Sequence, residues 1–574
     1  MLKIAGQFRR LVGLCVQAPG GRANLVLFVI IVALSLGSVY ATLRIVEWTG
    51  NFYSAIQKVD GPESLSQIGI FALIVALNSV RGLTAEYLRK VLEIRWRKTL
   101  TDAALDLWTQ DKAYWHLSQS ATNRIDNPDQ RIAEDCRLFV KSMLGEALDL
   151  IGRVVGLFSY LAVLWGLSNF PLSLALIGID LEIPRYMIWA AFIYVAISSG
   201  ITHLLGRPLK GLLAEQQKRE ASFRFSMARW RTAFDEVALS GGEEAEKRIF
   251  RNRFAAISSN WHKLIRRELI LGSFTFPFQH SVLRIPLFVA LPGYLAGNVT
   301  FGGLMQLGTA FSSVVTTLSW FIFSYRDLAD LVATSSRLDN FMQAAKSGHA
   351  RASALTRTSH QNSGGLMIAT VSLTTPEGRP LLSVAELRLQ PGETVWLRGV
   401  SGIGKTTLVK AIAGLWRHGA GQIGMPSGNW MFLPQKAYLP LGTIFDAAAY
   451  PSTATAIGEP AIRHALSAVG LEHRAKHPID VLPAGDTACE GLSGGELQRL
   501  ALARILIHQP DWVVLDEATS ALDDAAEQDL LTLLRQSLPR TGFVVIAHRP
   551  PQGPAGIRVI DLHQSTSIAA TIPV

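Results

Sequence analysis

A glycine-rich stretch in the second half of the chain has the residues and spacing needed to bind phosphate groups. It follows the apolar, strand-like run 393–397 and precedes a helix-like segment. Glycines let backbone N–H groups approach phosphate oxygens, and a helix N-terminus adds partial positive charge. Lys405 can reach the β- and γ-phosphates of a nucleotide, and the Thr406 hydroxyl can ligate Mg²⁺. The predicted ATP-binding residues of this stretch are Gly399, Val400, Ser401, Gly402, Ile403, Gly404, Lys405, Thr406 and Thr407.

Two acidic residues end an apolar run later in the chain. The run 512–515 is typical of a buried parallel strand, and Asp516 and Glu517 follow it directly. Open α/β sheets bind ligands at the carboxyl ends of such strands. We therefore expect Asp516 to hold Mg²⁺ and Glu517 to act as the general base that polarises the attacking water. The alternative is a solvated strand end, and the glycine-rich loop upstream argues against it.

A second glycine-rich turn opens another predicted helix. It consists of Leu492, Ser493, Gly494, Gly495 and Glu496. Its residues alone indicate either a phosphate-binding turn or a helix that is capped by its serine. With the two preceding patterns, it resembles the signature sequence of ABC transporters. The resemblance covers about 366–574 and implies two ATP molecules held between two subunits, each turn closing over the ATP bound by its partner.

The same resemblance implies roles for further residues. It assigns Gln435 to contact with ATP and Mg²⁺, Asp523 to the D-loop, and His548 to contact with the γ-phosphate. A lone histidine is more often a surface or core residue, but this one follows an apolar strand. Thr375 stands where many family members stack adenine on an aromatic residue. We therefore expect the adenine contacts to be weaker or to come from elsewhere.

The first half of the chain contains long apolar segments. The 574 residues are 49% hydrophobic and 17% charged, which is too apolar for an ordinary soluble protein and too charged for a pure membrane bundle. Apolar segments of roughly 20 residues match the thickness of a bilayer. Six spans are predicted near 24–46, 66–88, 145–170, 186–206, 268–296 and 303–325.

The distribution of charge predicts the topology and the domain organisation. The polar segments 89–142 and 207–267 are rich in Lys and Arg and are expected to be cytoplasmic, as are both termini. Their tips are expected to reach the ATPase domain. The predicted fold is a multidomain membrane protein with an all-α six-helix transmembrane domain, 1–342, and an α/β P-loop ABC ATPase domain, 366–574. A polar linker without a core-forming pattern is predicted over 343–365.

The net charge of +10 and the three cysteines point to no additional module. Basic residues between apolar spans are expected to face anionic lipid, so no nucleic-acid partner is predicted. Cys15, Cys136 and Cys489 are far apart in the sequence and lack the spacing of metal ligands or of a disulfide framework.

Charged residues within the predicted spans suggest a polar cavity. Asp149 and Arg153 are four residues apart in the third span and are expected to pair with each other. His280 and Arg284 have the same spacing in the fifth span, which also contains prolines. Because charges within spans usually face a cavity or a partner, these two residues are predicted to line a cavity for polar or anionic cargo.

Several sequence segments resemble those of one branch of the ABC transporters. Asn127–Asp135 and the sequence around Gln435 are similar to the SbmA/BacA-related bacterial branch and to the peroxisomal subfamily D fatty-acyl transporters. The segment that begins at Asp235 is similar to that branch's motif between the fourth and fifth spans. Its predicted role is coupling to the ATPase domain, and an exposed charged helix is the alternative.

The resemblance implies a half-transporter that acts with a second subunit, most simply as a homodimer in a bilayer. ATP hydrolysis would drive a peptide-like or other large polar or amphipathic substrate across a bacterial inner membrane, with the ATPase domain cytoplasmic. The alternatives are an acyl-CoA or lipid transporter of the same fold in a peroxisomal or plastid membrane, and an ATP-gated channel or regulatory membrane protein. The direction of transport stays open.

Overall fold

The computed structural model of the chain divides into two compact units. The first comprises Met1–Leu107 and Asp126–Gln343, and the second comprises Trp108–Ile125 and Ala344–Val574. The second unit therefore includes the tip of the first polar extension. The structure describes residues 2–119, 127–173, 182–281, 284–347, 354–360, 364–440, 442–475, 492–547, 550 and 557–564.

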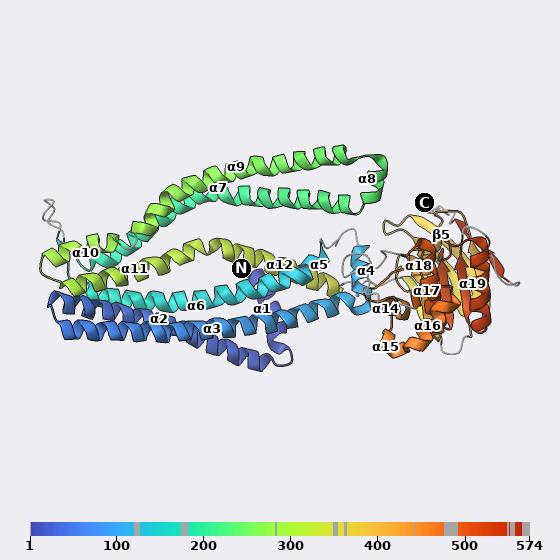
Figure 1. Cartoon of the computed structure of the whole chain (residues 1–574), viewed down its shortest axis with the longest axis horizontal. Helices are drawn as coiled ribbons and strands as arrows, with labels where there is room; N and C mark the ends of the chain where they lie inside the picture. Colours follow the sequence, from blue (N-terminus) through green and yellow to red (C-terminus); the bar gives the residue numbers. More distant parts are fainter. Residues whose placement is uncertain are drawn as a thin grey trace, which may run out of the picture. The chain divides into compact units, whose positions relative to one another are not determined.

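The first unit is almost entirely helical (Figure 1). Its long helices are α1 (Leu2–Gln17), α2 (Gly21–Gln57), α3 (Gly61–Thr109), α6 (Cys136–Leu167), α7 (Tyr186–Arg231), α9 (Glu243–Ser281), α10 (Ile285–Leu295), α11 (Phe301–Phe323) and α12 (Tyr325–Ser347). The short elements are η1 (Gln110–Lys112), α4 (Ala113–Ser118), α5 (Pro128–Gln130), η2 (Arg131–Asp135), β1 (Leu172–Ser173), β2 (Glu182–Ile183) and α8 (Phe234–Ser240). Of these short elements, η1 and α4 belong to the second unit.

The first four predicted spans coincide with helices that are long and apolar enough to cross a membrane. These helices are α2, α3, the continuous helical stretch Pro128–Leu167 and α7. Large apolar side chains such as Leu73, Leu77 and Val80 are exposed along α3, as expected for a lipid-facing surface. The fifth predicted span is divided between α9 and α10, and the sixth coincides with α11.

Helix α1 occupies the N-terminal segment before the first apolar span. Gln7, Leu11 and Cys15 recur every four residues on one face and are buried. The Arg10 guanidinium donates to both carboxylate oxygens of Asp339 in α12, at 2.9 and 2.6 Å. The helix is thus tied to α12 by a contact that spans most of the first unit's sequence.

The polar segment 127–135 forms α5 and the π-helical turn η2, which lead into α6. The Asp135 carboxylate is only 1% exposed. It accepts a hydrogen bond of 2.8 Å from Arg131 and two of 3.1 and 3.0 Å from Arg337 of α12. Asp135, the last residue of this segment, therefore joins the start of α6 to α12 through an ion pair.

Helices α7 and α9 lie side by side and are joined through α8 (Figure 1). Phe223 of α7 contacts Phe250 and Phe254 of α9 edge to face. Gly241 ends α8 with a φ of 61°, a left-handed conformation that glycine adopts without strain. Asp235 is exposed in α8, and its coupling role stays a prediction.

The second unit contains two five-stranded sheets with helices around them. Its strands are β3 (Ala354–His360), β4 (Leu366–Thr374), β5 (Pro380–Leu389), β6 (Thr394–Arg398), β7 (Gly419–Pro426), β8 (Trp430–Leu433), β9 (Trp512–Asp516), β10 (Gly542–Ile546), β11 (Arg558–Asp561) and β12 (His563–Gln564). Its main helices are α13 (Lys405–Ile412), α14 (Ile444–Ala449), α15 (Ala454–Ile457), α16 (Glu459–Ala468), α17 (Glu472–Ala475), α18 (Gly494–His508) and α19 (Asp524–Ser537).

One sheet is entirely parallel, in the order β11-β6-β10-β9-β8. Every residue of β9 and β10 is buried, which explains why both strands read as continuous apolar runs. The other sheet has the order β12-β5-β4-β7-β3. Parallel strands bring the loops that follow β6, β8 and β9 to one edge, where the predicted site residues lie.

The polar linker predicted over 343–365 contains regular secondary structure over part of its length. Helix α12 continues to Ser347, and β3 pairs in parallel with β7 at the edge of the second sheet. The strand is largely polar, and Leu355 is its one apolar residue packed against the core. Because an edge strand is held by backbone hydrogen bonds to its neighbour, its sequence carries little apolar pattern.

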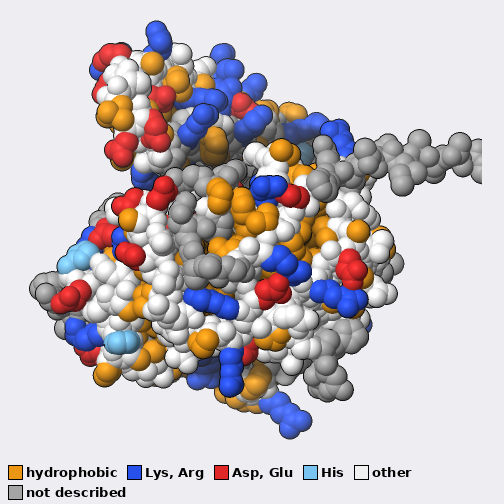
Figure 2. All heavy atoms as spheres, turned by 90° about the vertical axis from the view of Figure 1, so that its right-hand side faces the viewer, with side chains coloured by type: hydrophobic (Ala, Val, Ile, Leu, Met, Phe, Trp, Pro, Cys, Tyr) orange, Lys and Arg blue, Asp and Glu red, His pale blue; other side chains and the backbone are white. Residues whose placement is uncertain are grey.

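The face of the molecule in Figure 2 shows how charge is distributed on the second unit. Lys and Arg side chains are interspersed with Asp and Glu side chains across the described surface of this unit. The described residues therefore present a mixture of both signs on this face.

Candidate nucleotide-binding site

The glycine-rich loop lies between β6 and α13, as its sequence context requires. Gly402 and Gly404 have φ values of 82° and 105°, which a residue with a side chain adopts only under strain. A Cβ on Gly399 would lie 3.3 Å from Ile403 and 3.4 Å from the carbonyl oxygen of Leu562. The loop is thus shaped to bring backbone close to a ligand at the N-terminus of α13.

The side chain of Lys405 folds back across this loop. Its Nζ donates to the carbonyl oxygen of Gly399 at 2.7 Å and to that of Val400 at 3.4 Å. The residue is only 7% exposed. Among the described residues this ammonium donates to neutral carbonyls, which do not neutralise its charge, so it can attract an anion.

Asp516 provides a buried carboxylate that fits a magnesium ion. It is 5% exposed, and its Oδ1 has no hydrogen-bond partner among the described residues. Burial raises the pKa of Asp516, and a hydrogen bond from Thr406 opposes that shift. Carboxylate and hydroxyl oxygens are the hard ligands that Mg²⁺ prefers, so an unsatisfied carboxylate oxygen beside a threonine hydroxyl fits this ion.

Glu517 and Gln435 are brought together from neighbouring strands. Gln435 follows β8, Glu517 follows β9, and the two strands are parallel neighbours. The Gln435 amide nitrogen donates to the Glu517 carboxylate at 2.7 Å. Glu517 has a φ of 56°, a strained conformation for a residue with a side chain, and such strain is concentrated at functional sites. His548 and Cys489 lie outside the described residues.

The second glycine-rich turn forms the N-terminus of α18. Ser493 and Glu496 form a capping box, in which the serine Oγ accepts from the Glu496 N–H at 3.2 Å and the glutamate accepts from the Ser493 N–H at 2.8 Å. Burial opposes ionisation of Glu496, but hydrogen bonds from the Ser493 N–H, Arg474 and His473 lower its pKa to about 2. Ser493 and Gly494 are exposed at the start of the helix. The serine is therefore a helix cap, and its contact with a partner's ATP stays a prediction.

Gln498 is a residue of this site that the sequence patterns did not single out. It is 5% exposed and connects α18 to the loop after β9. Its amide nitrogen donates to the Ser520 hydroxyl at 3.1 Å, and its amide oxygen accepts from the Ala521 N–H at 2.8 Å. Downstream, Asp523 caps α19 by accepting from the Ala526 N–H at 2.7 Å. The one indication of this role in the sequence is that Gln498 is a polar residue on the buried face of α18.

Replacing Gln498 with leucine is expected to lower the ATP turnover number about tenfold with little change in nucleotide affinity. The loop after β9 would lose both of its hydrogen bonds to Gln498, and with them its attachment to α18. Steady-state ATPase assays separate the turnover number from KM. Gln536→Leu, at an exposed position of α19, is the matched control. Equal turnover in both variants would show that Gln498 does not position this loop.

Thr375 closes the turn between β4 and β5. Its N–H donates to the Arg379 carbonyl at 2.8 Å, and its hydroxyl accepts from the Arg379 N–H at 3.2 Å. An aromatic side chain reaches this turn from Trp416, whose indole N–H donates to the Thr374 carbonyl at 3.0 Å. The aromatic residue beside the turn therefore comes from after α13 in the sequence.

Comparisons with known proteins agree with this arrangement. A family model described as ABC transporter transmembrane region 2 matches residues 14–289, and one described as ABC transporter matches 382–520. The chain is 30% identical over 543 residues to the inner membrane ABC transporter ATP-binding protein YddA of Escherichia coli, with 94% of each chain covered. It is 25% identical to the human lysosomal cobalamin transporter ABCD4, covering 92% of this chain and 89% of that protein.

A solved structure of a bacterial Atm1-family ABC exporter with ATP bound has the same fold. The TM-score is 0.66 with 18% sequence identity, and the match covers 93% of this chain and 94% of that chain. At that identity the likeness concerns the fold.

Proposed function

Since the chain belongs to the ABC transporter family, as a half-transporter whose membrane domain is fused to an ATPase domain, we propose that it carries a peptide-like or other large polar or amphipathic solute across a bacterial inner membrane. ATP hydrolysis is coupled to transport in this family. The observation that carries the ATP-driven part of the proposal is the group at the sheet edge, where the buried Lys405 ammonium lies near the Asp516 carboxylate, one oxygen of which has no partner among the described residues.

The residues of the ATPase domain divide the chemistry of hydrolysis between them. On ATP binding, the Lys405 ammonium exchanges its carbonyl partners for the β- and γ-phosphates. Thr406, Asp516 and Gln435 would hold Mg²⁺, which when bound neutralises charge on those phosphates. Glu517 orients and polarises the attacking water, and Gln435 holds that carboxylate before nucleotide arrives.

A second subunit completes each site. Because a half-transporter carries one phosphate loop and one signature turn, each ATP needs the Ser493–Gly495 turn of a partner, and a homodimer is the simplest assembly. ATP binds more tightly when the two ATPase domains are closed, and this differential affinity drives reorientation of the membrane domains. In this proposal His548 contacts the γ-phosphate and Asp523 lies at the dimer interface.

Reconstitution in liposomes with ATP on one side tests the proposal. The probes are cationic and acidic peptides, cobalamin, which the name of the human relative gives as its cargo, and an acyl-CoA. We expect ATP-dependent accumulation of at least one probe by the wild type. Lys405→Ala is expected to lose both nucleotide affinity and accumulation, because the ammonium that attracts phosphate is gone. Flux that is equal in wild type and Lys405→Ala would instead indicate a channel.

A further inference from the structure

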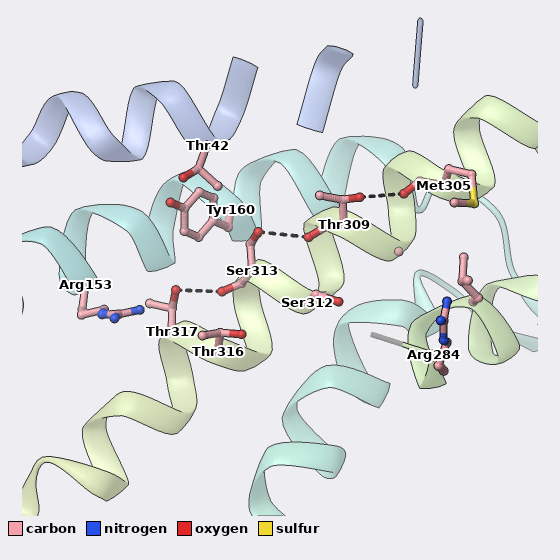
Figure 3. Close-up of a pocket in the computed structure, with 12 residues that line it drawn as sticks. Thr42, Arg153, Tyr160, Arg284, Met305, Thr309, Ser312, Ser313, Thr316 and Thr317 are labelled. Atoms are coloured by element: carbon pink, nitrogen blue, oxygen red, sulfur yellow. Dashed lines mark hydrogen bonds between the residues drawn. The ribbon is translucent and has the colours of Figure 1, made fainter. Parts of the chain in front are cut away.

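A cavity of about 550 Å³ lies among the helices of the first unit (Figure 3). Residues of α2, α6, α10 and α11, with Arg284 just before α10, form its walls. This volume is within the range of small-molecule sites. The side chains used below are Thr42, Arg153, Arg284, Thr309, Ser313 and Thr317.

Arg153 and Arg284 are the only charged residues that line this cavity in the described part of the chain. The structure differs from the expected pairing of Asp149 with Arg153, since no such ion pair forms among the described residues. Neither guanidinium group has a hydrogen-bond or ion-pair partner among the described residues. His280 contacts Phe276 edge to face and is not among the described residues that line the cavity.

Two unpaired guanidinium groups are costly in a membrane domain. Arginine does not lose its proton in proteins, so its charge must be offset by an anion or by water. Figure 3 shows the two arginines at opposite ends of a row of α11 hydroxyls, with Arg153 extending toward Thr317. The wall therefore carries a net charge of about two positive units, and planar guanidinium groups favour carboxylate and phosphate oxygens.

Arg284 lies at the cavity, in a turn just before α10. Its backbone N–H donates to the Ser281 carbonyl at 2.9 Å. Pro286 lies in the first turn of α10, where the N–H that proline lacks would have no helical partner. A helix therefore begins directly after Arg284.

The hydroxyls of α11 add a second requirement for the ligand. Thr309, Ser313 and Thr317 each donate to the carbonyl four residues earlier, at 2.9, 3.0 and 2.7 Å (Figure 3). A hydroxyl whose hydrogen is already donated offers its lone pairs to a ligand. This wall therefore favours a ligand with N–H or O–H donors beside its anionic group.

An adjoining cavity of about 390 Å³ explains why we expect the anion to bind in the first cavity. The two cavities share Thr42, Arg153, Tyr160 and Thr317. In the second cavity Arg89 donates to Glu86 at 2.8 Å, and Arg81 donates to Asn78 and to the Leu34 carbonyl. Asp149 also lines it. Its arginines other than Arg153 are thus already partnered.

We propose that the first cavity binds an anionic cargo, with carboxylate or phosphate groups of the cargo at Arg153 and at Arg284 and with its N–H or O–H donors bonded to the α11 hydroxyls between them. This inference rests on the proposed transport function and narrows its substrate class to anionic, donor-bearing molecules. The carboxylates of an acidic peptide and the phosphates of an acyl-CoA share this chemistry.

Binding to the full-length protein in nanodiscs without ATP tests the site. The probes are a fluorescent acidic peptide, its twin with Gln for Glu and an amidated C-terminus, and a fluorescent acyl-CoA. We expect the wild type to bind at least one anionic probe more tightly than the neutral twin. Arg153→Gln and Arg284→Gln should each weaken that binding about 10- to 100-fold, because each removes a charge-assisted contact. The probe whose binding these substitutions weaken shows whether the site binds a peptide carboxylate or an acyl-CoA phosphate.

Two controls keep the result decisive. Arg224→Gln removes an exposed cation of α7 outside both cavities and should bind like wild type. Arg153→Lys keeps the charge and should recover part of the affinity. Equal binding of the neutral twin, or equal affinity in wild type and both glutamine variants, would overturn the proposal. If the wild type binds anions but shows no ATP-dependent flux, the proposed transport function is contradicted, whereas the proposed binding site is not.

Discussion

Glu517→Gln is expected to lower the rate of ATP hydrolysis by about 100- to 10,000-fold while leaving ATP binding in place. The amide has nearly the same shape as the carboxylate and can still accept the hydrogen bond from Gln435. In the wild type, the Gln435 amide nitrogen lies 2.7 Å from the Glu517 carboxylate oxygen. It cannot act as a base toward water. The variant should therefore bind ATP and accumulate as a closed dimer. Phosphate release measures hydrolysis, and retention of labelled ATP after gel filtration measures trapping.

The matched control for this experiment is Glu386→Gln, which makes the same change at an exposed position of β5. It should hydrolyse ATP at the wild-type rate. Normal turnover by Glu517→Gln would rule out the general-base role. Loss of ATP binding by the variant would instead show that this carboxylate shapes the nucleotide pocket, and the proposed division of roles with Asp516 would be wrong.

Asp135→Asn is expected to destabilise the membrane domain by about 1–3 kcal/mol, because it removes the buried charge that accepts hydrogen bonds from two arginines. The carboxylate is 1% exposed and receives hydrogen bonds from both Arg131 and Arg337. An amide carries no charge and has one oxygen, so it cannot satisfy both guanidinium groups. The Tm of the purified protein in detergent should fall, and the junction between α6 and α12 should loosen.

Glu134→Gln is the control because it changes the neighbouring acid of the same turn, which is exposed and bonded only locally to Gln130 among the contacts of the described structure. Its Tm should match that of the wild type. A double variant that also carries Arg337→Gln separates the ion pair from the general effect of substitution, since a coupled pair gives non-additive changes. Equal Tm values for Asp135→Asn and wild type, or fully additive changes, would contradict this role.

Features that depend on a few consecutive residues could be predicted from the sequence. The glycine-rich loop needs small residues at fixed spacing, and it lies between β6 and α13 as predicted. Asp516 is the last residue of β9, a strand whose five residues are all buried. The first four apolar spans are also local, because each helix satisfies its own backbone hydrogen bonds.

Contacts between distant segments could not be predicted in this way. Strand β3 is polar and exists through its pairing with β7, so no apolar pattern marks it. Gln498 became part of the site only when α18 packed beside the loop after β9. The spacing of Asp149 and Arg153 suggested a local pair, yet the helix places Arg153 on a cavity wall shared with Arg284.

The residue types at the edge of the parallel sheet and the apolar helices could be predicted from the chain's local patterns, because loop spacing and helix periodicity are short-range properties. Which charges are paired depends instead on how the helices pack. Asp135 meets Arg337, 202 residues away, whereas Arg153 and Arg284 meet no acid among the described residues. Electrostatic pairing depends on distances between helices, and those distances are fixed only when the helices pack.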